Sequence, residues 1–393
     1  MPITIDGTGT ITGATTLAST VASPTFTTPA LGTPASGILT SCTGVPFDGF
    51  KNRIINGAMV IDQRNAGASV TPSTLYNTYT LDRWNTVYSV GSKFSVQQNA
   101  GSVTPPAGFQ NYLGVTSLSA YTPGSAEQYT LKQVIEGYNI SDLGWGAAGA
   151  QTVTLSFWVR SSLTGTFGAA LSNAAGNRSY PFAYTIIAAN TWEQKTVTIA
   201  GDTTGTWLST NGVGIEVIFS LGAGSTYLGT AGAWAAAAYT GTTGQTNMVG
   251  TNGATFYITG VQLEKGSTAS SFDYRSIGTE LALCQRYFEV LGYGCIAMAE
   301  SGSTYVMNLP YRVTKRTAPS LGLTITSNLR VRQFGVSDRD ATSPTVVSSA
   351  GSTTGGNLKI SGFSSIGSAS TPAGIGYTTT SEDGNAFFAS AEL

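Results

Sequence analysis

The chain has 393 residues, of which only 10% are charged, and its 19 basic and 20 acidic side chains leave a net charge of −1. This length exceeds what one hydrophobic core usually holds, so we expect two or more domains. No basic run points to a nucleic-acid partner, no apolar run reaches the length of a membrane span, and no signal peptide opens the chain. We therefore expect a protein that is made in a cytoplasm, binds no nucleic acid and is not inserted in a membrane.

The composition predicts a mainly β protein without a cofactor. Hydrophobic residues make up 41% of the chain, which argues against disorder, and 49 glycines suit short strands joined by tight turns. The absence of histidine excludes Ser-His and Cys-His catalysis. Cys42, Cys284 and Cys295 are too few and too far apart for a disulfide framework or a zinc site, so we expect reduced thiols and no metal.

The sequence of residues 1–48 predicts an extended thread. Pro24, Pro29 and Pro34 recur at a spacing of five, and proline fits neither a helix nor a central strand. The segment is either a flexible linker or a thread that gains order against its own copies or another protein, and the regular spacing favours the second. Its stretch TPALGTPASGILTSCTGVPF resembles a segment near the N-terminus of many bacteriophage tail fibre proteins. The resemblance implies attachment to the phage tail or to an adaptor or fibre protein.

Residues 49–276 predict a β-sandwich of the jelly-roll type. In TVTLSFWVR and VGIEVIFSL hydrophobic residues alternate with others, as in strands that bury one face. The inward positions are Val153, Leu155, Phe157 and Val159 in the first run and Val213, Ile215, Val217, Phe219 and Leu221 in the second. In ATFYITGVQLE the alternation changes phase at Gly260, which predicts a β-bulge. Short alternating strands separated by turn signals are typical of a sandwich or jelly roll.

Two motifs, NRIINGAM and FYITGVQLEKG, resemble the first and last strands of jelly-roll carbohydrate-binding modules. Those modules often begin with Asn-Gly-Asp-Phe beside a structural calcium. The matching residues here are Asn56, Gly57, Ala58 and Met59, and Ala58 replaces the acid, so the resemblance does not carry the calcium site over to this chain. The ordered series YTLDRW, LSFWVRSSLTGTF, TWEQKTVTIAGDTTGTW, FYITGVQLEKG and FDYRSIGTELALCQRYFE is also similar to the central domain of phage tail fibres. The resemblance covers residues 24–316 and implies a virion protein.

The segment from Ile277 to Leu291 is predicted to be a helix that joins two β regions. Its apolar residues recur at gaps of four and three, the spacing of a coiled-coil seam. These residues are Ile277, Leu281, Cys284, Phe288 and Leu291. Thr279 is the predicted N-cap, followed by Glu280 where the helix dipole favours an acid. A helix this short needs a partner for its stripe. The partner is either a sheet of the same chain or, in the interpretation that we favour, further copies around a trimer axis.

The long loop of residues 222–253 carries candidate carbohydrate-binding residues. Tyr227, Trp234 and Tyr239 stand out there among small side chains. Aromatic rings with a polar edge suit stacking against a sugar ring. The alternative is that they anchor the loop to the domain or to a neighbouring subunit.

Residues 292–393 predict a second β region, which we interpret as the distal tip of a fibre. Arg330 and Arg332 lie on one face of a predicted strand. They form either a solvated face or a contact for an acidic sugar or a phosphate.

No motif predicts catalysis. The carboxylates of the sandwich region that could cleave a glycoside as a pair include Asp62, Asp82, Glu127, Glu136, Asp142, Glu193, Asp202 and Glu216, and none lies in a recognisable motif. A phosphate-binding loop, a dinucleotide fingerprint, a zinc spacing and an internal repeat are absent from the sequence. We therefore expect a protein that is not an enzyme.

These features together predict a phage tail fibre subunit, assembled in the host cytoplasm as a homotrimer and carried in the virion tail. The predicted parts are an attachment segment, a jelly roll, a linking helix and a tip, at residues 1–48, 49–276, 277–291 and 292–393. Its predicted role is adhesion to a bacterial surface polysaccharide through several weak sites acting together. The alternatives are a polysaccharide depolymerase and a spacer that carries another receptor-binding protein.

Overall fold

The computed structural model describes most of the chain beyond its first 50 residues. The described residues are 51–73, 77–291, 295–301, 303–324, 329–331, 339–363, 372–378 and 386–393. The chain divides into two units, Met1–Asp48 and Gly49–Leu393, and all described residues lie in the second. The predicted thread of residues 1–48 therefore lies outside the described residues. None of the helices in the described part has the length and apolarity that a membrane crossing requires.

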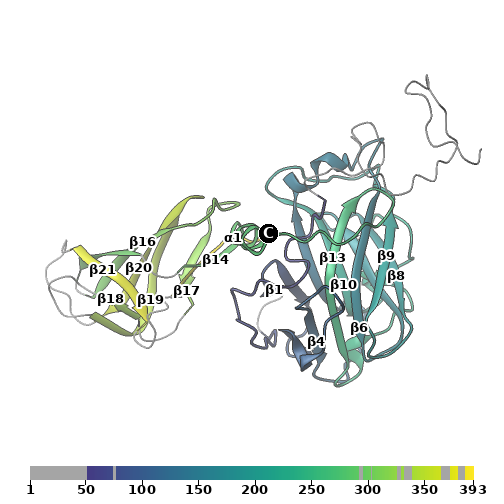
Figure 1. Ribbon diagram of the computed structural model, residues 1–393, viewed down its shortest axis with the longest axis horizontal. Helices are drawn as coiled ribbons and strands as arrows, with labels where there is room; N and C mark the ends of the chain where they lie inside the picture. Colours follow the sequence, from purple (N-terminus) through teal and green to yellow (C-terminus); the bar gives the residue numbers. More distant parts are fainter. Residues whose placement is uncertain are drawn as a thin grey trace, which may run out of the picture. The chain divides into compact units, whose positions relative to one another are not determined.

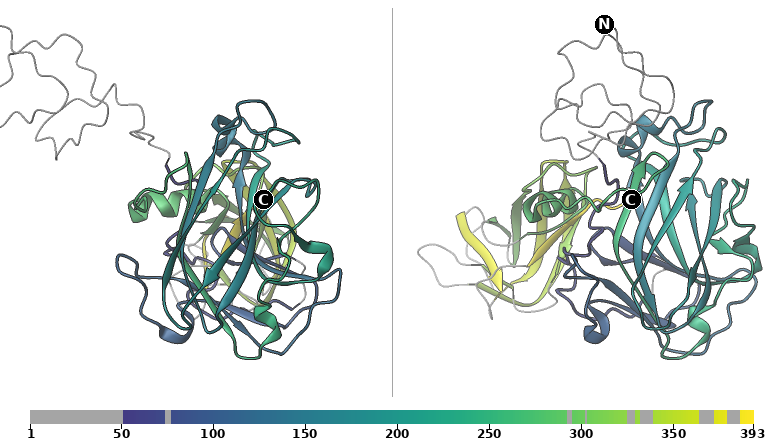
Figure 2. Two further views of the ribbon diagram at one scale, coloured as in Figure 1. Left: turned by 90° about the vertical axis from the view of Figure 1, so that its right-hand side faces the viewer. Right: turned by 45° about the vertical axis from the view of Figure 1, so that its right-hand side comes forward.

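Two antiparallel sheets face each other and form the predicted sandwich (Figures 1 and 2). The six-stranded sheet has the order β1 (Asn77–Leu81), β2 (Trp84–Tyr88), β5 (Gln128–Glu136), β10 (Val213–Ala223), β7 (Gly165–Ser172), β8 (Ser179–Ile186). The five-stranded sheet has the order β3 (Phe94–Gln98), β4 (Leu113–Ser117), β13 (Thr255–Lys265), β6 (Val153–Ser161), β9 (Glu193–Ile199). Short elements lie in the connections: η1 (Ala100–Ser102), η2 (Gly137–Asn139), η3 (Ser141–Leu143), η4 (Ser225–Tyr227), β11 (Leu228–Gly229), β12 (Gly241–Thr242) and η5 (Met248–Gly250).

The alternation read from the sequence places the core between these sheets. The four predicted inward residues of β6 are fully buried, and so are Ile215, Val217, Phe219 and Leu221 of β10. Trp84 is the largest fully buried side chain, and its ring lies 6.4 Å from that of Phe219. The prediction of a mainly β chain with a sandwich is therefore confirmed.

The predicted β-bulge is also present in β13. The register with β6 shifts between Thr259 and Gln262, and Gly260 has a φ of +61°. A Cβ atom at Gly260 would lie 2.6 Å from Cζ of Phe109. Glycine is therefore required here both by the left-handed backbone and by the close approach of an aromatic ring.

The helix α1 (Ile277–Gln285) is shorter than predicted, so the prediction of a helix reaching Leu291 is wrong. Its N-cap is Ser276, whose side chain accepts a hydrogen bond from the Thr279 amide, so the prediction of Thr279 as the cap is wrong too. The last predicted turn is instead β14 (Phe288–Leu291), which pairs with β22 (Phe387–Ser390). Pairing with a distant strand overrides the helical spacing, because the FEVL sequence suits a strand as well.

The predicted seam is consequently not a continuous helical stripe. Cys284 packs with Ile55, Ile61 and Tyr287 of the same chain, and Phe288 and Leu291 are buried in β14. Ile277 remains 64% exposed and Leu281 is half-buried. The structure thus favours packing on the same chain for the buried part of the stripe, whereas the homotrimer stays a prediction.

The second predicted β region contains a small sheet and a closed barrel (Figure 1). The sheet has the order β14, β22, β17 (Ser320–Leu323). The barrel has the order β15 (Ile296–Ser301), β16 (Thr304–Pro310), β20 (Gly355–Phe363), β19 (Arg339–Gly351), β18 (Leu329–Val331), β21 (Pro372–Thr378). Tyr305, Met307, Leu358 and Ile360 belong to one buried cluster there. The central strand of the small sheet is β22, which pairs with β14 on one side and with β17 on the other. The central strand therefore comes from near the end of the sequence.

Residues 391–393 follow β22 and bind to the sandwich. We name these three residues the clamp. The carboxylate of Glu392 pairs with Arg64 at 2.6 Å and with Arg83, and all three side chains are largely buried. Arg316 donates to the carbonyl oxygen atoms of Ala391 and Glu392 at 2.8 and 2.7 Å. Charge-assisted hydrogen bonds at buried positions are strong and directional, so the clamp holds one defined geometry.

We expect Glu392→Gln to lower the free energy of unfolding by about 3 kcal/mol, because it leaves two buried guanidinium groups without a counter-charge. Urea denaturation followed by circular dichroism measures this change. Glu300→Gln is the matched control: Glu300 pairs with Lys359 at an exposed position of the barrel, where loss of the pair is expected to change stability by less than about 1 kcal/mol. Equal effects of the two substitutions would contradict the importance of the clamp.

Asp82 lies beside the clamp and makes the stability of this region dependent on pH. Burial raises the pKa of Asp82 from its ordinary value of 3.8 to about 6, against the opposing effect of Arg64. The folded state therefore holds this proton more tightly than the unfolded chain, and the stabilisation is lost as pH rises through the folded pKa. Relative to an Asp82→Asn variant, the wild-type free energy of unfolding should fall by roughly 3 kcal/mol between about pH 4 and about pH 7. If the difference in free energy of unfolding between the wild type and Asp82→Asn stays constant over this pH range, the raised pKa of Asp82 is refuted.

Candidate functional site

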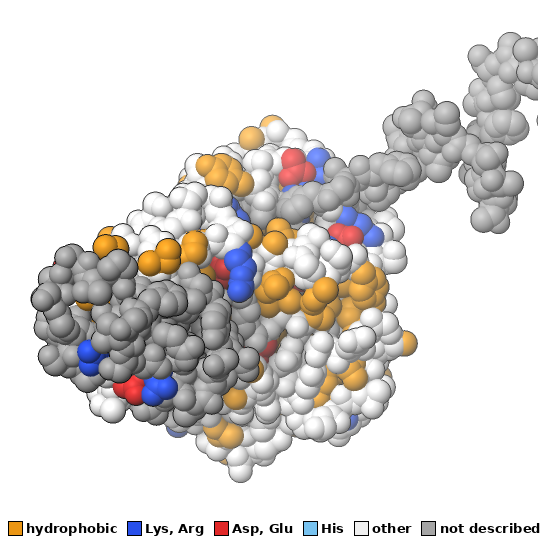
Figure 3. Space-filling view, turned by 60° about the vertical axis from the view of Figure 1, so that its left-hand side comes forward, with side chains coloured by type: hydrophobic (Ala, Val, Ile, Leu, Met, Phe, Trp, Pro, Cys, Tyr) orange, Lys and Arg blue, Asp and Glu red, His pale blue; other side chains and the backbone are white. Residues whose placement is uncertain are grey.

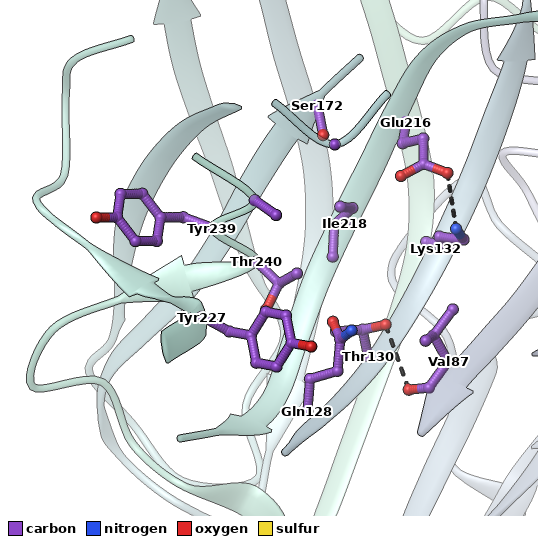
Figure 4. Close-up of a pocket in the computed structure, with 12 residues that line it drawn as sticks. Val87, Gln128, Thr130, Lys132, Ser172, Glu216, Ile218, Tyr227, Tyr239 and Thr240 are labelled. Atoms are coloured by element: carbon purple, nitrogen blue, oxygen red, sulfur yellow. Dashed lines mark hydrogen bonds and ion pairs between the residues drawn. The ribbon is translucent and has the colours of Figure 1, made fainter. Parts of the chain in front are cut away.

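A cavity of about 180 Å³ lies on the outer face of the six-stranded sheet (Figure 4). Strands β2, β5, β7 and β10 contribute its floor, and the segment after β10 contributes its wall. The lining residues are Val87, Gln128, Thr130, Lys132, Ser172, Gly176, Glu216, Ile218, Tyr227, Ala238, Tyr239 and Thr240.

The floor follows from the period of two in a strand. In β5, Tyr129 and Leu131 point into the core, so Thr130 and Lys132 point to the opposite face. In β10, Val217 and Phe219 are core residues, and Glu216 and Ile218 share the outer face. The register aligns Ile218 with Lys132. Antiparallel pairing therefore brings the outward side chains of both strands together.

The wall is a loop that folds back onto the sheet. The amide of Thr240 donates to the carbonyl oxygen of Tyr227 at 2.9 Å, and the amide of Tyr239 donates to Oγ of Ser179 at 3.1 Å. The ring of Tyr239 lies so close to Gly229 that a Cβ atom there would be 2.3 Å from Cδ2 of the ring. These contacts hold both tyrosines at the cavity in the absence of a ligand.

The polar groups of the cavity include one ion pair and one unpaired hydroxyl. Nζ of Lys132 lies 2.7 Å from Oε1 of Glu216, and the two side chains are 14% and 20% exposed. Oγ1 of Thr240 is buried and has no hydrogen-bond partner among the described residues, and Thr240 itself is only 8% exposed. Figure 4 shows the tyrosine rings on the loop side and the ion pair on the strand side. Such a site offers an apolar ring face, donors and acceptors to a polyhydroxylated ligand.

The structure brings two of the three predicted loop aromatics to the cavity. Tyr227 and Tyr239 line it, whereas Trp234 packs against Trp145, Trp207 and Tyr180 with ring centroids 5.2–5.4 Å apart. The Trp234 indole N–H donates to the carbonyl oxygen of Ala200 at 2.8 Å. Trp234 therefore has the anchoring role that was the alternative interpretation.

The predicted arginine pair is not part of this cavity. Arg330 makes a two-pronged ion pair with Asp340, with Nε–Oδ1 and Nη2–Oδ2 distances of 2.6 and 2.7 Å. The hydrogen bond from Arg330 lowers the pKa of Asp340. The guanidinium charge of Arg330 is thus balanced inside its own hairpin. Arg332 lies outside the described residues.

Sequence reasoning did not identify Lys132 or Thr240 as site residues, and it named Glu216 only as one acid among eight. The available signal was a single lysine in β5 and a single glutamate in the interior of β10, each with uncharged neighbours in its strand. Lys132 and Glu216 are 84 residues apart, so their meeting depends on strand order and register.

The carboxylates of the sandwich do not converge on the cavity. Glu216 is the one carboxylate among the lining residues. The others accept hydrogen bonds elsewhere: Asp62 and Glu127 from backbone amides, Asp82 from Gln63, Glu136 from Arg286, Asp142 from Arg53, Glu193 from the backbone at Ile187 and Ala188, and Asp202 from Arg178. A pair of facing carboxylates, which most glycoside hydrolases need, is thus not among the residues that line this cavity.

The Asn-Gly motif has a structural explanation. The Asn56 side chain donates to the carbonyl oxygen atoms of Ile61 and Asp82 at 2.8 and 3.0 Å. A Cβ atom at Gly57 would lie 2.2 Å from the carbonyl oxygen of Val261. Nearby, Arg275 donates to the carbonyl oxygen of Ile54 at 3.0 Å. Within the described ranges, no group of three or more acidic, cysteine or histidine side chains is placed to hold a metal ion.

No family model and no curated protein matches this chain. Solved structures with partial similarity include the enzymatically active domain of tailspike protein 4 of bacteriophage CBA120, at 12% identity and a TM-score of 0.28 over 55% of this chain and 21% of that chain. A structure titled "CBM4 structure and function" is 15% identical, with a TM-score of 0.27 over 54% and 98%. The family 11 carbohydrate-binding module of a Clostridium thermocellum cellulosomal cellulase is 14% identical, with a TM-score of 0.25 over 50% and 99%. This chain therefore matches only about a fifth of the tailspike chain, and identities and TM-scores this low say nothing about its own activity.

Proposed function

We propose that this chain is a saccharide-binding subunit of a phage tail fibre and that the cavity between β5, β10 and the loop is its binding site. The observation that carries the proposal is the preformed cavity that Tyr227 and Tyr239 line together with the Lys132–Glu216 ion pair. Sugars combine apolar ring faces with a belt of hydroxyl groups, and this lining complements both. Binding requires little rearrangement, because the loop is already hydrogen-bonded to the sheet.

We propose further that the interaction is binding without hydrolysis. Glycoside cleavage by the common mechanisms uses an acid and a second carboxylate on opposite sides of the scissile bond. Glu216 is the one carboxylate among the residues that line the cavity, and it forms an ion pair with Lys132.

The fibre role rests on the sequence resemblance described above and includes a homotrimer attached through its N-terminal segment to the tail or to an adaptor protein. Cavities of this size bind single saccharide units weakly. Three copies on one fibre raise the effective concentration at the second and third contact, so that the assembly adheres although each site is weak. The expected partner is a polysaccharide of a bacterial surface, and the expected location is the virion.

We expect Tyr227→Ala to weaken saccharide binding at least about tenfold, because it removes an aromatic face worth about 1.4 kcal/mol or more. Binding is measured by a glycan array followed by titration calorimetry on the best ligand. Tyr138→Ala is the matched control, since Tyr138 is 60% exposed and does not line the cavity. Unchanged binding by Tyr227→Ala, or equal loss in both variants, would place the site elsewhere.

Incubation with the polysaccharide that binds best distinguishes adhesion from depolymerase activity. We expect no new reducing ends after prolonged incubation of the wild-type protein with the bound polysaccharide. Reducing ends that form with the wild type and disappear in Glu216→Gln would replace this proposal by an enzymatic one.

The homotrimer is tested by size-exclusion chromatography with multi-angle light scattering on the full-length chain. We expect a mass close to three times 40.5 kDa. A stable monomer at micromolar concentration would exclude the trimer and leave the saccharide site untouched.

A further inference from the structure

We infer that the cavity accepts one uncharged sugar ring, at a chain end or a branch, and discriminates against acidic sugars. This inference rests on the proposed saccharide binding and adds the size and the charge of the ligand. Three observations carry it: the volume of the cavity, the pairing of its one cation and the kind of polar groups that remain free.

The volume sets the size of the ligand. The cavity of about 180 Å³ has room for about six water molecules at the volume of the liquid. It is smaller than the range of roughly 300–1,000 Å³ that is usual for drug-sized ligands. One pyranose ring fits this volume, and further rings of a longer glycan would lie outside the cavity. The loop that carries Tyr227, Tyr239 and Thr240 forms a wall on one side, which favours the tip of a glycan over the middle of a chain.

The ion pair sets the charge of the ligand. Lys132 and Glu216 are the charged residues of the lining, and they neutralise each other at 2.7 Å. A ligand carboxylate would either meet the repulsion of Glu216 or draw Lys132 away from it, and both cost free energy in a partly buried site. Arg330, the other predicted contact for an acidic sugar, is likewise balanced by Asp340. On the face drawn in Figure 3, lysine and arginine side chains lie next to aspartate and glutamate side chains.

The remaining polar groups match neutral hydroxyls. Glu216 can accept hydrogen bonds from several hydroxyl groups, and the Lys132 ammonium has three donors, of which the ion pair uses one. A sugar hydroxyl both donates and accepts, so it can satisfy both side chains. An ionised carboxylate only accepts, so it adds no donor to the one that Lys132 gives Glu216.

The test compares neutral and acidic terminal sugars on the full-length protein. The probes are methyl glycosides of glucose, galactose and N-acetylglucosamine and of glucuronic and N-acetylneuraminic acid, which compete with the best array glycan at low and at high sodium chloride. We expect at least one neutral glycoside to compete, the acidic ones to fail, and the affinity to change less than about twofold with salt, since a neutral ligand forms no screened ion pair.

Two substitutions decide whether the ion pair is responsible. Glu216→Gln frees the Lys132 charge, so we expect acidic glycosides to bind about tenfold more tightly than to the wild type, with an affinity that falls as salt rises. Glu193→Gln is the matched control, because Glu193 pairs with Lys195 on the other sheet at 15% and 16% exposure, close to the 20% and 14% of Glu216 and Lys132, and we expect it to leave binding unchanged. Near-ultraviolet circular dichroism confirms that both variants are folded.

The outcomes separate this inference from the proposal on which it rests. Preferential wild-type binding of an acidic sugar, or recognition of long chains with no competition by any single ring, overturns the inference and leaves saccharide binding intact. Failure of Glu216→Gln to gain acidic ligands overturns the role of the ion pair. Binding of no glycan by the wild type overturns the proposed function and this inference with it.

Discussion

The buried ion pairs of Glu392 connect three distant segments of the chain. Arg64 and Arg83 come from the sandwich, and Glu392 follows the central strand of the small sheet. The guanidinium groups also stack on the rings that follow α1: Arg64 lies 3.7 Å from the ring centroid of Phe288, and Arg83 lies 3.6 Å from that of Tyr287. Leu393 packs into the same cluster as Cys284, and the C-terminus accordingly lies beside α1 in Figure 1. Each arginine thus has its charge balanced on one side and its flat face covered on the other, which suits guanidinium chemistry.

Further buried pairs hold the segment after α1 within its own chain. Tyr287 donates to Glu136 at 2.6 Å, and Arg286 makes a two-pronged pair with the same carboxylate. Lys315 is fully buried and pairs with Glu289, also fully buried. Removing one partner of such pairs is costly, because the other charge stays buried. The part of the predicted seam from Cys284 onward is therefore held within its own chain, whereas Ile277 at its start is exposed.

The candidate site depends on a different constraint, the antiparallel register of β5 and β10. Register places Lys132 and Glu216 on one outer face, and the loop that follows β10 brings Tyr227 and Tyr239 to the same cavity. A slip of either strand by one residue would turn the charged side chain of that strand into the core. The site is thus held by the same alternation that buries Leu131 and Val217, so its geometry is coupled to the stability of the core. Because Lys132 and Glu216 neutralise each other, the cavity lining presents aromatic rings and hydrogen-bonding groups but carries no net charge.

Local patterns in the sequence determined the strands and the start of the helix. Alternation located β6 and β10, the phase change at Gly260 located the bulge, and these features persist because side-chain period and glycine conformation are local properties. Tertiary structure alone decided that α1 ends at Gln285, because the partner of Phe288–Leu291 is β22, about a hundred residues later in the chain. It also decided that Trp234 anchors the loop while Tyr227 and Tyr239 face a cavity, and that Lys132 meets Glu216. Contacts between residues far apart in sequence follow from strand order and register, which no single segment encodes.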